Sequence, residues 1–420
     1  MTKLDINPEI SIVIVNFNGE RFLKKLFASL AIQTFRNFEV IFIDNNSVDE
    51  SVSFLKKNVL NKKIFPGNTI LIESDRNTGF AEGNNIAVKK ANGKYIFFLN
   101  TDTTLEKDTL EKLQIAISKD PFVAGVTPKV YLSRFAPLKI FDNVGMCMNF
   151  NGSPYNKGIG QLDLGQYDQE EELMGICFAA CLVRKNVFLA LDGLDESYFA
   201  YFEDVDWCFK ARKNGYKFIS VPDAIVNHLH SGTTSTLSHA WKYKQIFQNY
   251  LRTVVKNFGK RNVLRIIPLK TKDLIGVLFK KESDSNLRKA ILEILFRFWT
   301  RDIFVYAFKR FHARRNFIPE ITDKSIFRLS IDEPSDFFNP TNYEAKISMR
   351  MLDFVIYKKN YIKSDAKLIK EWESLKESVY CASPRNKWKK RFDEFAKKRL
   401  DPSLTKKQLD LITQQIIGRS

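Results

Sequence analysis

The chain contains 420 residues, a length that can bury a large core and form two or more domains. Hydrophobic residues make up 44% of it, which excludes a disordered chain, and five scattered cysteines give no even disulfide framework, which favours a reducing compartment. The sequence "MTKLDINPEI" has no apolar signal region, and no stretch reaches ~18 uninterrupted apolar residues, so we expect neither a secreted nor a membrane-spanning protein.

The formal net charge of +18 is unevenly distributed along the chain. Residues up to Ser238 include 26 Lys and Arg against 28 Asp and Glu, whereas those from His239 onward include 40 against 20. This shift predicts a near-neutral globular domain over residues 1–238, followed by a strongly basic part whose function is separable.

Apolar strands alternate with amphipathic helices in the N-terminal part of the sequence. We expect strands at residues 10–18, 38–44, 69–74 and 94–100, with helices that include residues 20–33 and 79–93. Gly93 is expected to close the second of these helices. A spacing of about 25 to 30 residues between strands predicts a Rossmann-like α/β domain with a mostly parallel central sheet.

Polar side chains follow each of these strands. Asn16 and Asp44 end the first two, residues 75–77 (Asp-Arg-Asn) follow the third, and residues 100–102 (Asn-Thr-Asp) follow the fourth. Because ligands bind outside the carboxyl ends of parallel strands, we expect these side chains to meet at one edge of the sheet. Taken singly, Asp44 and Asp102 are equally consistent with a turn or a helix cap, but their repetition favours a binding site.

A second group of polar residues begins an expected helix over residues 204–215. Glu203 and Asp204 lie at its N-terminus, where the helix dipole favours an ionised carboxylate. Asp206 precedes Lys210 by four residues, so we expect a solvated ion pair between them.

Two short strands are expected after this helix, at residues 216–221 and 224–228, and the second ends at His228. A lone histidine is more often a structural residue. One that ends a strand in a domain with a row of carboxylates is a candidate metal ligand.

Several of these segments are motifs that follow one another in a characteristic order between residues 10 and 235. They are "SIVIVNFNG", "FIDNNSVDES", "RNTGFAEGNN", "FLNTDT", "FAACLVRKNVF", "GLDESYFAYFEDVDWCFKARKNGY" and "NHLHSGTTS". Together they resemble a bacterial family 2 inverting glycosyltransferase with a GT-A fold, and they are most similar to the rhamnosyltransferase-like branch. The resemblance implies a GT-A type catalytic domain followed by a basic, mainly helical region.

The resemblance implies a divalent cation, Mg²⁺ or Mn²⁺, as the cofactor. Asp102 and His228 match the family's metal ligands, and His230 is an alternative to His228. Asn100 stands where the family's Asp-x-Asp motif has its first aspartate, so this site has one carboxylate fewer.

The implied reaction moves a sugar, with rhamnose the first candidate, from a nucleotide-diphosphate donor to a glycan or lipid-linked acceptor in cell-surface polysaccharide synthesis. The expected donor is dTDP-rhamnose or a UDP-sugar. Asp204 matches the family's catalytic base, and Glu203 is its rival. Asp44 matches the contact to the nucleobase. The residues predicted to bind substrate are Asn16, Phe17, Asp44, Arg76, Asn77, Gly79, Phe80, Asn84, Asn100, Thr101 and Trp207.

The basic part contains two expected amphipathic helices, residues 241–258 and 287–317, that are rich in Arg, Phe and Trp. Such helices are typical of a membrane interface, although helices packed on the catalytic domain with a solvated charged face have the same pattern. We predict a membrane-associated region at residues 239–320, an anionic membrane surface as partner, and a cytoplasmic protein peripheral to the inner face of the cell membrane. Residues 321–420 are expected to form a connector and a C-terminal helical region.

Two other functions are compatible with parts of the sequence. Clustered Lys and Arg are the footprint of nucleic-acid binding, but no nucleic-acid motif accompanies them, so we expect no such partner. Asn100 suggests a non-catalytic nucleotide-sugar-binding protein, against which the presence of Asp102, Asp204 and His228 argues.

Overall fold

The computed structural model describes most of the chain up to residue 330. The described residues are 7–136, 139–148, 152–160, 163, 167–230, 238–280, 283–313, 318 and 321–330. Most of the region predicted for residues 321–420 lies outside them.

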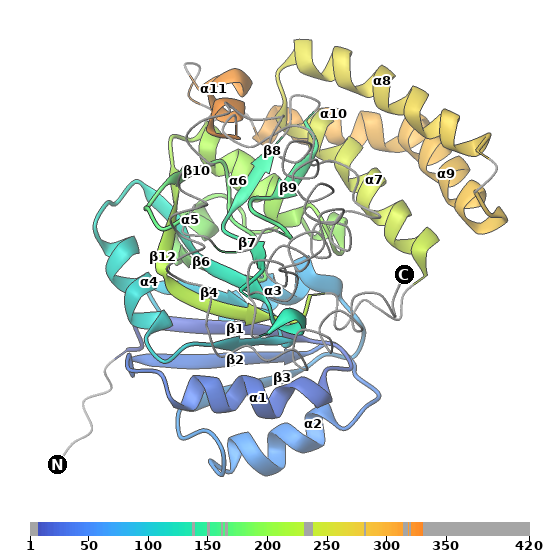
Figure 1. The fold of residues 1–420 in the computed structure, drawn as a ribbon. Helices are drawn as coiled ribbons and strands as arrows, with labels where there is room; N and C mark the ends of the chain where they lie inside the picture. The colour runs from blue at the N-terminus through green and yellow to red at the C-terminus, as the bar shows by residue number, and fades with distance from the viewer. Residues whose placement is uncertain are drawn as a thin grey trace, which may run out of the picture.

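A mixed β-sheet forms the centre of the molecule (Figure 1). The strands in chain order are β1 Ile10–Asn16, β2 Phe38–Asp44, β3 Asn68–Glu73, β4 Tyr95–Leu99, β5 Thr103–Leu105, β6 Val123–Leu132, β7 Phe141–Asn143, β8 Met146–Met148, β9 Pro154–Asn156, β10 Glu172–Leu173, β11 Ala180–Arg184 and β12 Lys217–His228. The order across the sheet is β10-β12-β6-β11-β4-β1-β2-β3, with β5 paired to β12 and β7 to β6. Strands β8 and β9 form a separate hairpin.

The pairing of the first four strands follows the expected βαβ pattern. Strand β1 pairs in parallel with β2 and with β4, and β2 pairs in parallel with β3. Strand β11 instead runs antiparallel to both β4 and β6. The predicted Rossmann-like α/β domain with a mainly parallel sheet is therefore confirmed.

Helices cover both faces of the sheet and continue beyond it. They are, in chain order, α1 Glu20–Ala31, α2 Ser51–Phe54, α3 Gly79–Lys90, α4 Thr109–Ser118, α5 Lys185–Ala190, α6 Glu203–Lys213, α7 His239–Asn257, α8 Lys260–Leu278, α9 Ser285–Arg297, α10 Ile303–Ala313 and α11 Asp323–Phe327. Two π-helical segments, Leu55–Leu60 and Phe298–Asp302, continue α2 and join α9 to α10. Single 3-10 turns lie at Ser133–Phe135, Glu196–Tyr198 and Arg328–Ser330.

Strand β1 shows how the sequence produces the layers. Successive side chains of a strand point to opposite faces of the sheet. Ile12 and Ile14 belong to the hydrophobic cluster under α1, whereas Val13 belongs to the cluster under α3 and α6. Helices α1 and α2 accordingly lie on one side of the sheet and α6 on the other (Figure 1). Burial of both faces explains the continuous apolar run of this strand.

Three local features differ from the expectation. The two strands expected after α6 are one strand, β12, whose register against β6 shifts between Val221 and Ile225. Helix α3 ends at Lys90, and Gly93 does not close it. A Cβ added to Gly93 would lie 2.5 Å from the backbone nitrogen of Ser11, so this glycine allows the turn to approach β1 closely. Helix α8 was not predicted.

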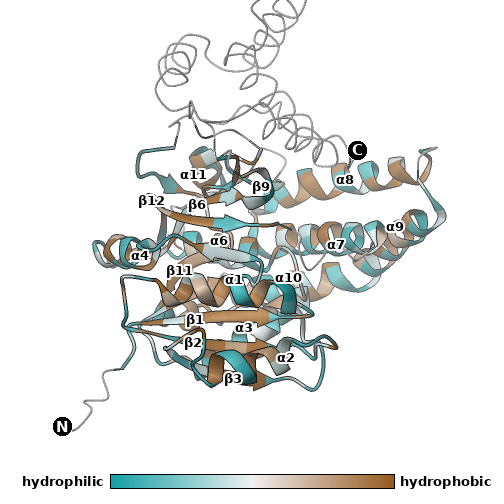
Figure 2. Ribbon diagram, turned by 60° about the horizontal axis from the view of Figure 1, so that its bottom comes forward, coloured by the Kyte–Doolittle hydropathy of each residue, from teal (hydrophilic) through white to brown (hydrophobic). Residues whose placement is uncertain are grey.

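Helix α7 joins the basic part of the chain to the first 238 residues. Ser238, at the predicted domain boundary, caps α7 by accepting a hydrogen bond from the Trp241 backbone nitrogen (3.2 Å). Leu251 of α7 is buried in one hydrophobic cluster with Tyr198 and with Phe209 of α6. Helices α7, α8 and α9 lie side by side in Figure 2. The described helices of the basic part, from α7 onward, therefore share a hydrophobic core with the first domain.

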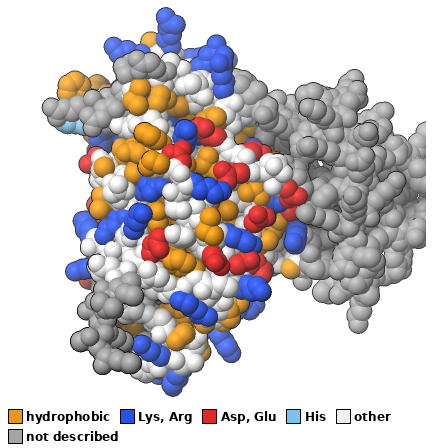
Figure 3. All heavy atoms as spheres, turned by 90° about the vertical axis from the view of Figure 1, so that its left-hand side faces the viewer, with side chains coloured by type: hydrophobic (Ala, Val, Ile, Leu, Met, Phe, Trp, Pro, Cys, Tyr) orange, Lys and Arg blue, Asp and Glu red, His pale blue; other side chains and the backbone are white. Residues whose placement is uncertain are grey.

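The surface differs from side to side. On the side of α4, Figure 3 shows basic and acidic side chains interspersed with apolar ones. Along α9 and α10, by contrast, an exposed apolar stripe is formed by Leu292, Phe296, Trp299, Phe304, Phe308 and Phe311. None of the helices in the described ranges has both the length and the hydropathy needed to cross a bilayer.

A buried ion cluster connects α6 to α7. Asp206 is 1% exposed and accepts hydrogen bonds from Lys256 Nζ (2.7 Å) and Asn257 Nδ2 (2.6 Å). Lys256 Nζ also contacts Asp195 Oδ2 at 2.9 Å. Lys210 donates to a backbone carbonyl instead. The predicted solvated pair between Asp206 and Lys210 is therefore wrong, because α7 covers this face of α6 and supplies the cation.

Replacing Lys256 with methionine is expected to lower the free energy of unfolding by about 3–5 kcal/mol, because it leaves the buried carboxylate of Asp206 without its cation. The matched control is Lys270→Met, whose partner Asp273 is largely exposed, so that this pair contributes about 0–1 kcal/mol. Urea unfolding of the full chain at neutral pH, followed by circular dichroism, measures both losses. Equal losses in the two variants would contradict the burial argument.

Candidate active site

The ends of β1 and β2 are tied together by hydrogen bonds. Asn16 Nδ2 donates to Asp44 Oδ1 (2.8 Å) and to Ser47 Oγ (3.1 Å), and Asp44 Oδ2 accepts from the Ser47 backbone nitrogen (2.9 Å). Asp44 thus closes the turn after β2, the alternative that the sequence left open, while it also meets Asn16 at the edge of the sheet. Asn16 Oδ1 is buried with no hydrogen-bond partner among the described residues, which leaves one acceptor available at this edge.

The loop between β3 and α3 is held by its own side chains. Asn77 Oδ1 accepts from the Gly79 backbone nitrogen (2.9 Å), and Arg76 pairs with Glu82. The Arg76 side chain is 60% exposed, and Phe17, just after β1, is 38% exposed. Among the predicted substrate-binding residues, these two side chains are accessible to a ligand without any rearrangement.

Gly79 brings α3 close to the segment that precedes α6. Its φ is +78°, and an added Cβ would lie 2.6 Å from the carbonyl oxygen of Phe199. This oxygen accepts hydrogen bonds from the backbone nitrogens of Phe80 (2.6 Å) and Ala81 (3.2 Å). Asn84 Nδ2 donates to the Phe80 carbonyl (2.8 Å). The loop predicted to bind the donor therefore touches the segment that leads into the predicted catalytic helix.

Strand pairing brings Asp102 to the end of β12. Thr103 lies opposite His228 in the antiparallel ladder of β5 and β12. The Asn100 carbonyl accepts a hydrogen bond from Thr103 Oγ1 (2.7 Å). Thr101, which lies between these two residues in the sequence, is buried. As a result, Asp102 Oδ1 lies 3.1 Å from His228 Nε2. The two predicted metal ligands are therefore adjacent.

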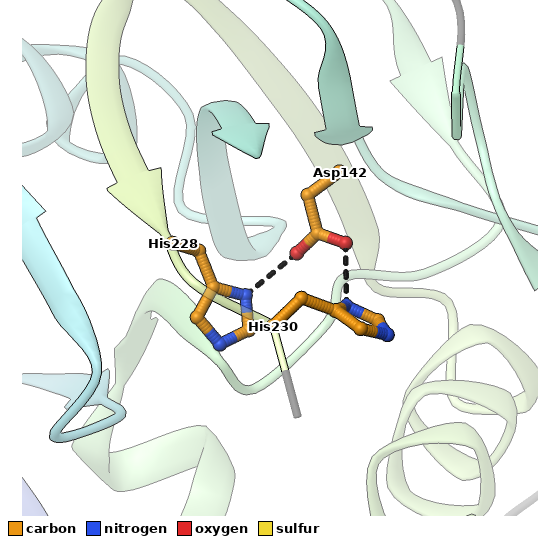
Figure 4. A group of neighbouring side chains, drawn as sticks. All are labelled: Asp142, His228 and His230. Atoms are coloured by element: carbon orange, nitrogen blue, oxygen red, sulfur yellow. Dashed lines mark hydrogen bonds and ion pairs between the residues drawn. The ribbon is translucent and has the colours of Figure 1, made fainter. Parts of the chain in front are cut away.

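Two carboxylates and two imidazoles form a cluster at this end of the sheet, and we call Asp102, Asp142, His228 and His230 the carboxylate–histidine cluster. His228 Nδ1 lies 2.7 Å from Asp142 Oδ2, and His230 Nδ1 lies 2.8 Å from Asp142 Oδ1. Figure 4 shows the Asp142 carboxylate between the two rings. His230 has a φ of +61°, a conformation uncommon outside glycine, and this conformation accompanies the contact of its ring with Asp142.

Opposite charges dominate the titration of this cluster. Burial acts to lower the pKa of His228, but attraction to Asp142 and hydrogen bonds to Asp102 and Asp142 outweigh it and raise the pKa to about 10. Burial acts to raise the pKa of Asp142, but His230 and His228 hold it well below its usual range. The site therefore favours positive charge between its carboxylates.

The cluster fits a divalent cation. Asp142, His228 and His230 each offer a ligand atom, and these atoms lie within 4.8 Å of one another, with Asp102 adjacent to His228. Carboxylate oxygens suit Mg²⁺ and Mn²⁺, and imidazole nitrogen shifts the preference toward Mn²⁺. Because a ligating imidazole must be neutral and the pKa of His228 is raised, cation binding would release a proton from the His228 ring.

Glu203 and Asp204 begin α6 as an acidic pair. Asp204 Oδ1 accepts from the Val205 backbone nitrogen (2.8 Å), and Oδ2 accepts from that of Phe178 (3.4 Å). Burial raises the pKa of Asp204 to about 6, although these hydrogen bonds oppose the rise. Burial and the charge of Asp204 raise the pKa of Glu203 well above its usual range, and Glu203 Oε2 has no hydrogen-bond partner in the described structure. Asp204 is thus the member of the pair that ionises close to neutral pH.

The segment before this acidic pair has an unusual backbone. The φ angles of Phe199, Tyr201 and Phe202 are +63°, +69° and +74°. Bulky residues rarely adopt such angles, and each costs on the order of 1–3 kcal/mol. Conformations of this kind persist only where surrounding contacts hold them, and they concentrate at functional sites.

Cys177 lies near both acidic groups. Burial raises the pKa of its thiol well above the usual value, and the charges of Asp204, Asp142 and Glu203 raise it further. The charges of the acidic pair and of Asp142 in the carboxylate–histidine cluster thus both act on this thiol.

Trp207 is the predicted substrate-binding residue that the structure places elsewhere. Its side chain has no exposed surface and packs against Phe178, Phe188 and Phe218 in the core. The prediction is corrected accordingly, because a side chain enclosed on all sides cannot contact substrate directly. It instead supports α6 from beneath.

Asp142 was not among the metal ligands predicted from the sequence. It lies on the short strand β7, 86 residues before His228, and no spacing rule links the two. The only local signal is a carboxylate at the end of an apolar stretch, "LKIFDN", the same pattern that identified Asp44 and Asp102.

Comparison with known proteins finds similarity to glycosyltransferases. Residues 11–188 match the model of the family described as Glycosyl transferase family 2. The low-salt glycan biosynthesis hexosyltransferase Agl10 of Haloferax volcanii is 23% identical over 233 residues, 52% of this chain and 67% of Agl10. The amylovoran biosynthesis glycosyltransferase AmsB of Erwinia amylovora is 25% identical over 223 residues, 52% of this chain and 68% of AmsB.

A shorter match is found to the poly(ribitol-phosphate) beta-N-acetylglucosaminyltransferase TarS of Staphylococcus aureus, which is 30% identical over 107 residues. These residues are 24% of this chain and 18% of TarS, so the chain spans only a small part of that relative. Among solved structures, GalNAc-T7 with UDP, GalNAc and Mn²⁺ has a TM-score of 0.50 and 17% identity, over 72% of this chain and 57% of that chain. The likeness concerns the fold and agrees with the expected GT-A type. Residues 11–188 therefore resemble the glycosyl transferase family 2, and the chain has a GT-A-like fold.

Proposed function

We propose that the chain is an inverting glycosyltransferase that transfers a sugar, with rhamnose the first candidate, from a nucleotide-diphosphate donor to a glycan or lipid-linked acceptor of the cell surface. The observation that carries the proposal is the acidic pair: a half-buried carboxylate whose pKa is raised to about 6, beside a buried glutamate whose pKa is also raised well above its usual range. The names of Agl10 and AmsB, a glycan biosynthesis hexosyltransferase and an amylovoran biosynthesis glycosyltransferase, support it.

The donor is proposed to bind along the carboxyl edge of β1, β2 and β4. Asn16 Oδ1 supplies an acceptor that has no partner among the described residues, and Asp44 lies beside it for the nucleobase. Phe17 offers an exposed aromatic face, and Arg76 an exposed cation for the phosphates. Asn77, Gly79, Phe80, Asn84, Asn100 and Thr101 shape the loop and strand end around them.

Asp102, Asp142 and His228 are proposed to hold the divalent cation, with His230 as a further ligand. A bound Mg²⁺ or Mn²⁺ would offset the negative charge that develops on the diphosphate leaving group. The chain's own residues prepare the site for it, because the two carboxylates lie on either side of the His228 ring, at 2.7 and 3.1 Å.

Asp204 is proposed to act as the general base. It takes the proton of the acceptor hydroxyl while that oxygen attacks the anomeric carbon and the bond from this carbon to the diphosphate oxygen breaks. A single displacement of this kind inverts the anomeric centre and forms no covalent intermediate. Burial and the charge of Asp204 raise the pKa of Glu203 well above its usual range, which favours Asp204 for the proton-accepting role.

Asp204→Asn is expected to reduce transfer by about 10² or more while folding and donor binding persist, because the amide keeps the shape but cannot accept the proton. For the wild type, the ionised base is required, so the rate should be constant above pH 6 and fall about tenfold per unit below it. Single-turnover transfer across this pH range measures both effects. A near-wild-type rate for Asp204→Asn together with inactive Glu203→Gln would assign the base to Glu203.

Asp142→Asn and Asp102→Asn are expected to weaken Mn²⁺ binding by about 10-fold or more each, because an amide offers the cation no negative charge. Calorimetric titration of the full chain with MnCl₂, without donor, measures this directly. Asp273→Asn, on the exposed face of α8, is the control and should bind Mn²⁺ as the wild type does. Unchanged binding in Asp142→Asn would restrict the site to the residues predicted from the sequence.

The exposed apolar stripe of α9 and α10 is proposed to rest on an anionic membrane at the cytoplasmic face, where a lipid-linked acceptor would be found. Helices α9 and α10 already bury Ile291, Ile294 and Tyr306 on their inner face, so the outer stripe is left exposed by the packing of the described residues. Four exposed residues between 285 and 312 are basic, namely Arg288, Lys289, Arg297 and Arg301, whereas the acidic Glu293 is paired with Lys244. Exposed aromatic residues flanked by basic ones are typical of interfacial helices.

Serine substitution of Phe296, Phe304 and Phe308 together is expected to reduce binding to phosphatidylcholine–phosphatidylglycerol vesicles by about tenfold or more, because each buried aromatic ring contributes roughly 1.5–3 kcal/mol. Vesicle flotation of the full chain measures it. The full chain is needed because α7 shares its core with α6.

The matched control for the stripe replaces three exposed apolar residues elsewhere on the molecule, Ile32, Val48 and Phe122, with serine. This variant should bind vesicles as the wild type does. Equal binding by both triple variants would refute the role of the stripe, and binding to vesicles of phosphatidylcholine alone would refute the requirement for anionic lipid.

A further inference from the structure

One side chain of α7 holds the strained segment that precedes the acidic pair. Asn249 is fully buried, and its Nδ2 donates to the carbonyl oxygens of Tyr198 (2.9 Å), Ala200 (3.0 Å) and Tyr201 (2.8 Å). Two amide hydrogens are thus shared among three carbonyls. These carbonyls belong to the segment in which bulky residues adopt positive φ, so the contacts of Asn249 fall where the backbone most needs external support.

The orientation of Asn249 is itself fixed. Its Oδ1 accepts a hydrogen bond from Arg252 Nη1 (3.1 Å), which leaves Nδ2 facing the segment. Arg252 Nη1 also donates to the Ser197 carbonyl (3.2 Å), and Arg252 Nε contacts Asp302 Oδ2 at 2.7 Å. The amide therefore cannot turn over without breaking a buried network of charged groups.

The segment connects the two halves of the candidate site. At one end, the Phe199 carbonyl accepts hydrogen bonds from the first residues of α3, next to the loop assigned to the donor. At the other end, the Phe202 carbonyl accepts from the Asp206 backbone nitrogen (2.9 Å) and so forms the first turn of α6, which carries Glu203 and Asp204. A change in the segment would move the acidic pair relative to the donor loop.

We propose that Asn249 is a positioning residue that holds segment 198–202 in its strained conformation and thereby places Asp204 against the bound donor and acceptor. The inference rests on the proposed function in assigning the base to Asp204. Asn249 touches none of the reacting atoms, because it acts through the three carbonyls. Helix α7 therefore helps to form the catalytic site, and the helices after the first domain also carry the exposed apolar stripe.

The neighbouring residue Gln248 provides a matched control. It is also a buried amide of α7, 2% exposed, but its Nε2 donates to Asp302 Oδ2 (3.0 Å), within the C-terminal helices. Leucine at either position removes one buried amide from the same helix. Only the change at Asn249 removes contacts with segment 198–202.

The test compares Asn249→Leu and Gln248→Leu in the full chain by two measurements. Hydrogen–deuterium exchange, without ligand, reports the protection of the amides of residues 198–206. Turnover is measured with Mn²⁺ and whichever of dTDP-rhamnose, UDP-glucose and UDP-galactose the wild type uses fastest. For Asn249→Leu we expect exchange of this peptide to rise about tenfold or more and kcat to fall about 10- to 100-fold, with a smaller change in the donor KM. Gln248→Leu should leave both near the wild-type values.

Asn249→Asp provides a milder variant if the leucine variant does not fold. It keeps the size of the side chain and the oxygen that accepts from Arg252, but as a carboxylate it has no Nδ2 donor. The same directions of change are expected. Unchanged exchange in the Asn249 variants, equal effects in Gln248→Leu, or faster exchange with unchanged kcat would each overturn the proposal. If the wild type turns over none of the three donors, the proposed function fails, and the exchange measurement still decides whether Asn249 holds the segment.

Discussion

The in-register parallel pairing of β1 with β2 and β4 is the constraint on which the donor side of the site depends. The last rung of the first pair places Asn16 opposite Asp44, which is why their side chains meet. Asp102 lies three residues after the end of β4, and the β5–β12 ladder then places it beside His228. A slip of one residue in any of these pairs would turn the polar side chains to the opposite face of the sheet.

Local patterns therefore predicted this part of the structure well. A strand buried on both faces is a continuous apolar run, and its end is marked by the first polar residue, so the edge residues could be found without any tertiary information. Asp142 also follows a short apolar stretch, but this signal is weak, because β7 is a three-residue strand whose position is set by pairing with β6. Its partner His228 is distant in sequence and contributes no local signal.

Helix α6 shows a different reason why a prediction from sequence can be wrong. Its charged residues Asp206, Lys210, Arg212 and Lys213 are typical of a solvated face, yet all are buried because α7, strand β10 and the segment before α11 cover that face. Polarity predicts exposure only when nothing else in the chain neutralises the charge. Here Lys256, fifty residues away in sequence, does so for Asp206. The same packing encloses Trp207, which accounts for its incorrect assignment to the substrate.

The acidic residues of α6 are separated into two kinds by this packing. Asp206 has a lysine and an asparagine as partners, so its charge is compensated inside the protein. Glu203 and Asp204 have no basic ion-pair partner among the described residues, and burial accordingly raises the pKa of both. When neighbouring carboxylates lie in contrasting environments, their pKa values differ, and this difference allows them to take different roles in acid–base chemistry. Helix α7 thus supplies Lys256, the cation that compensates Asp206, but it places no cation beside Glu203 and Asp204, the pair proposed to act in catalysis. The proposed chemistry of the first domain therefore depends on the helix that follows it.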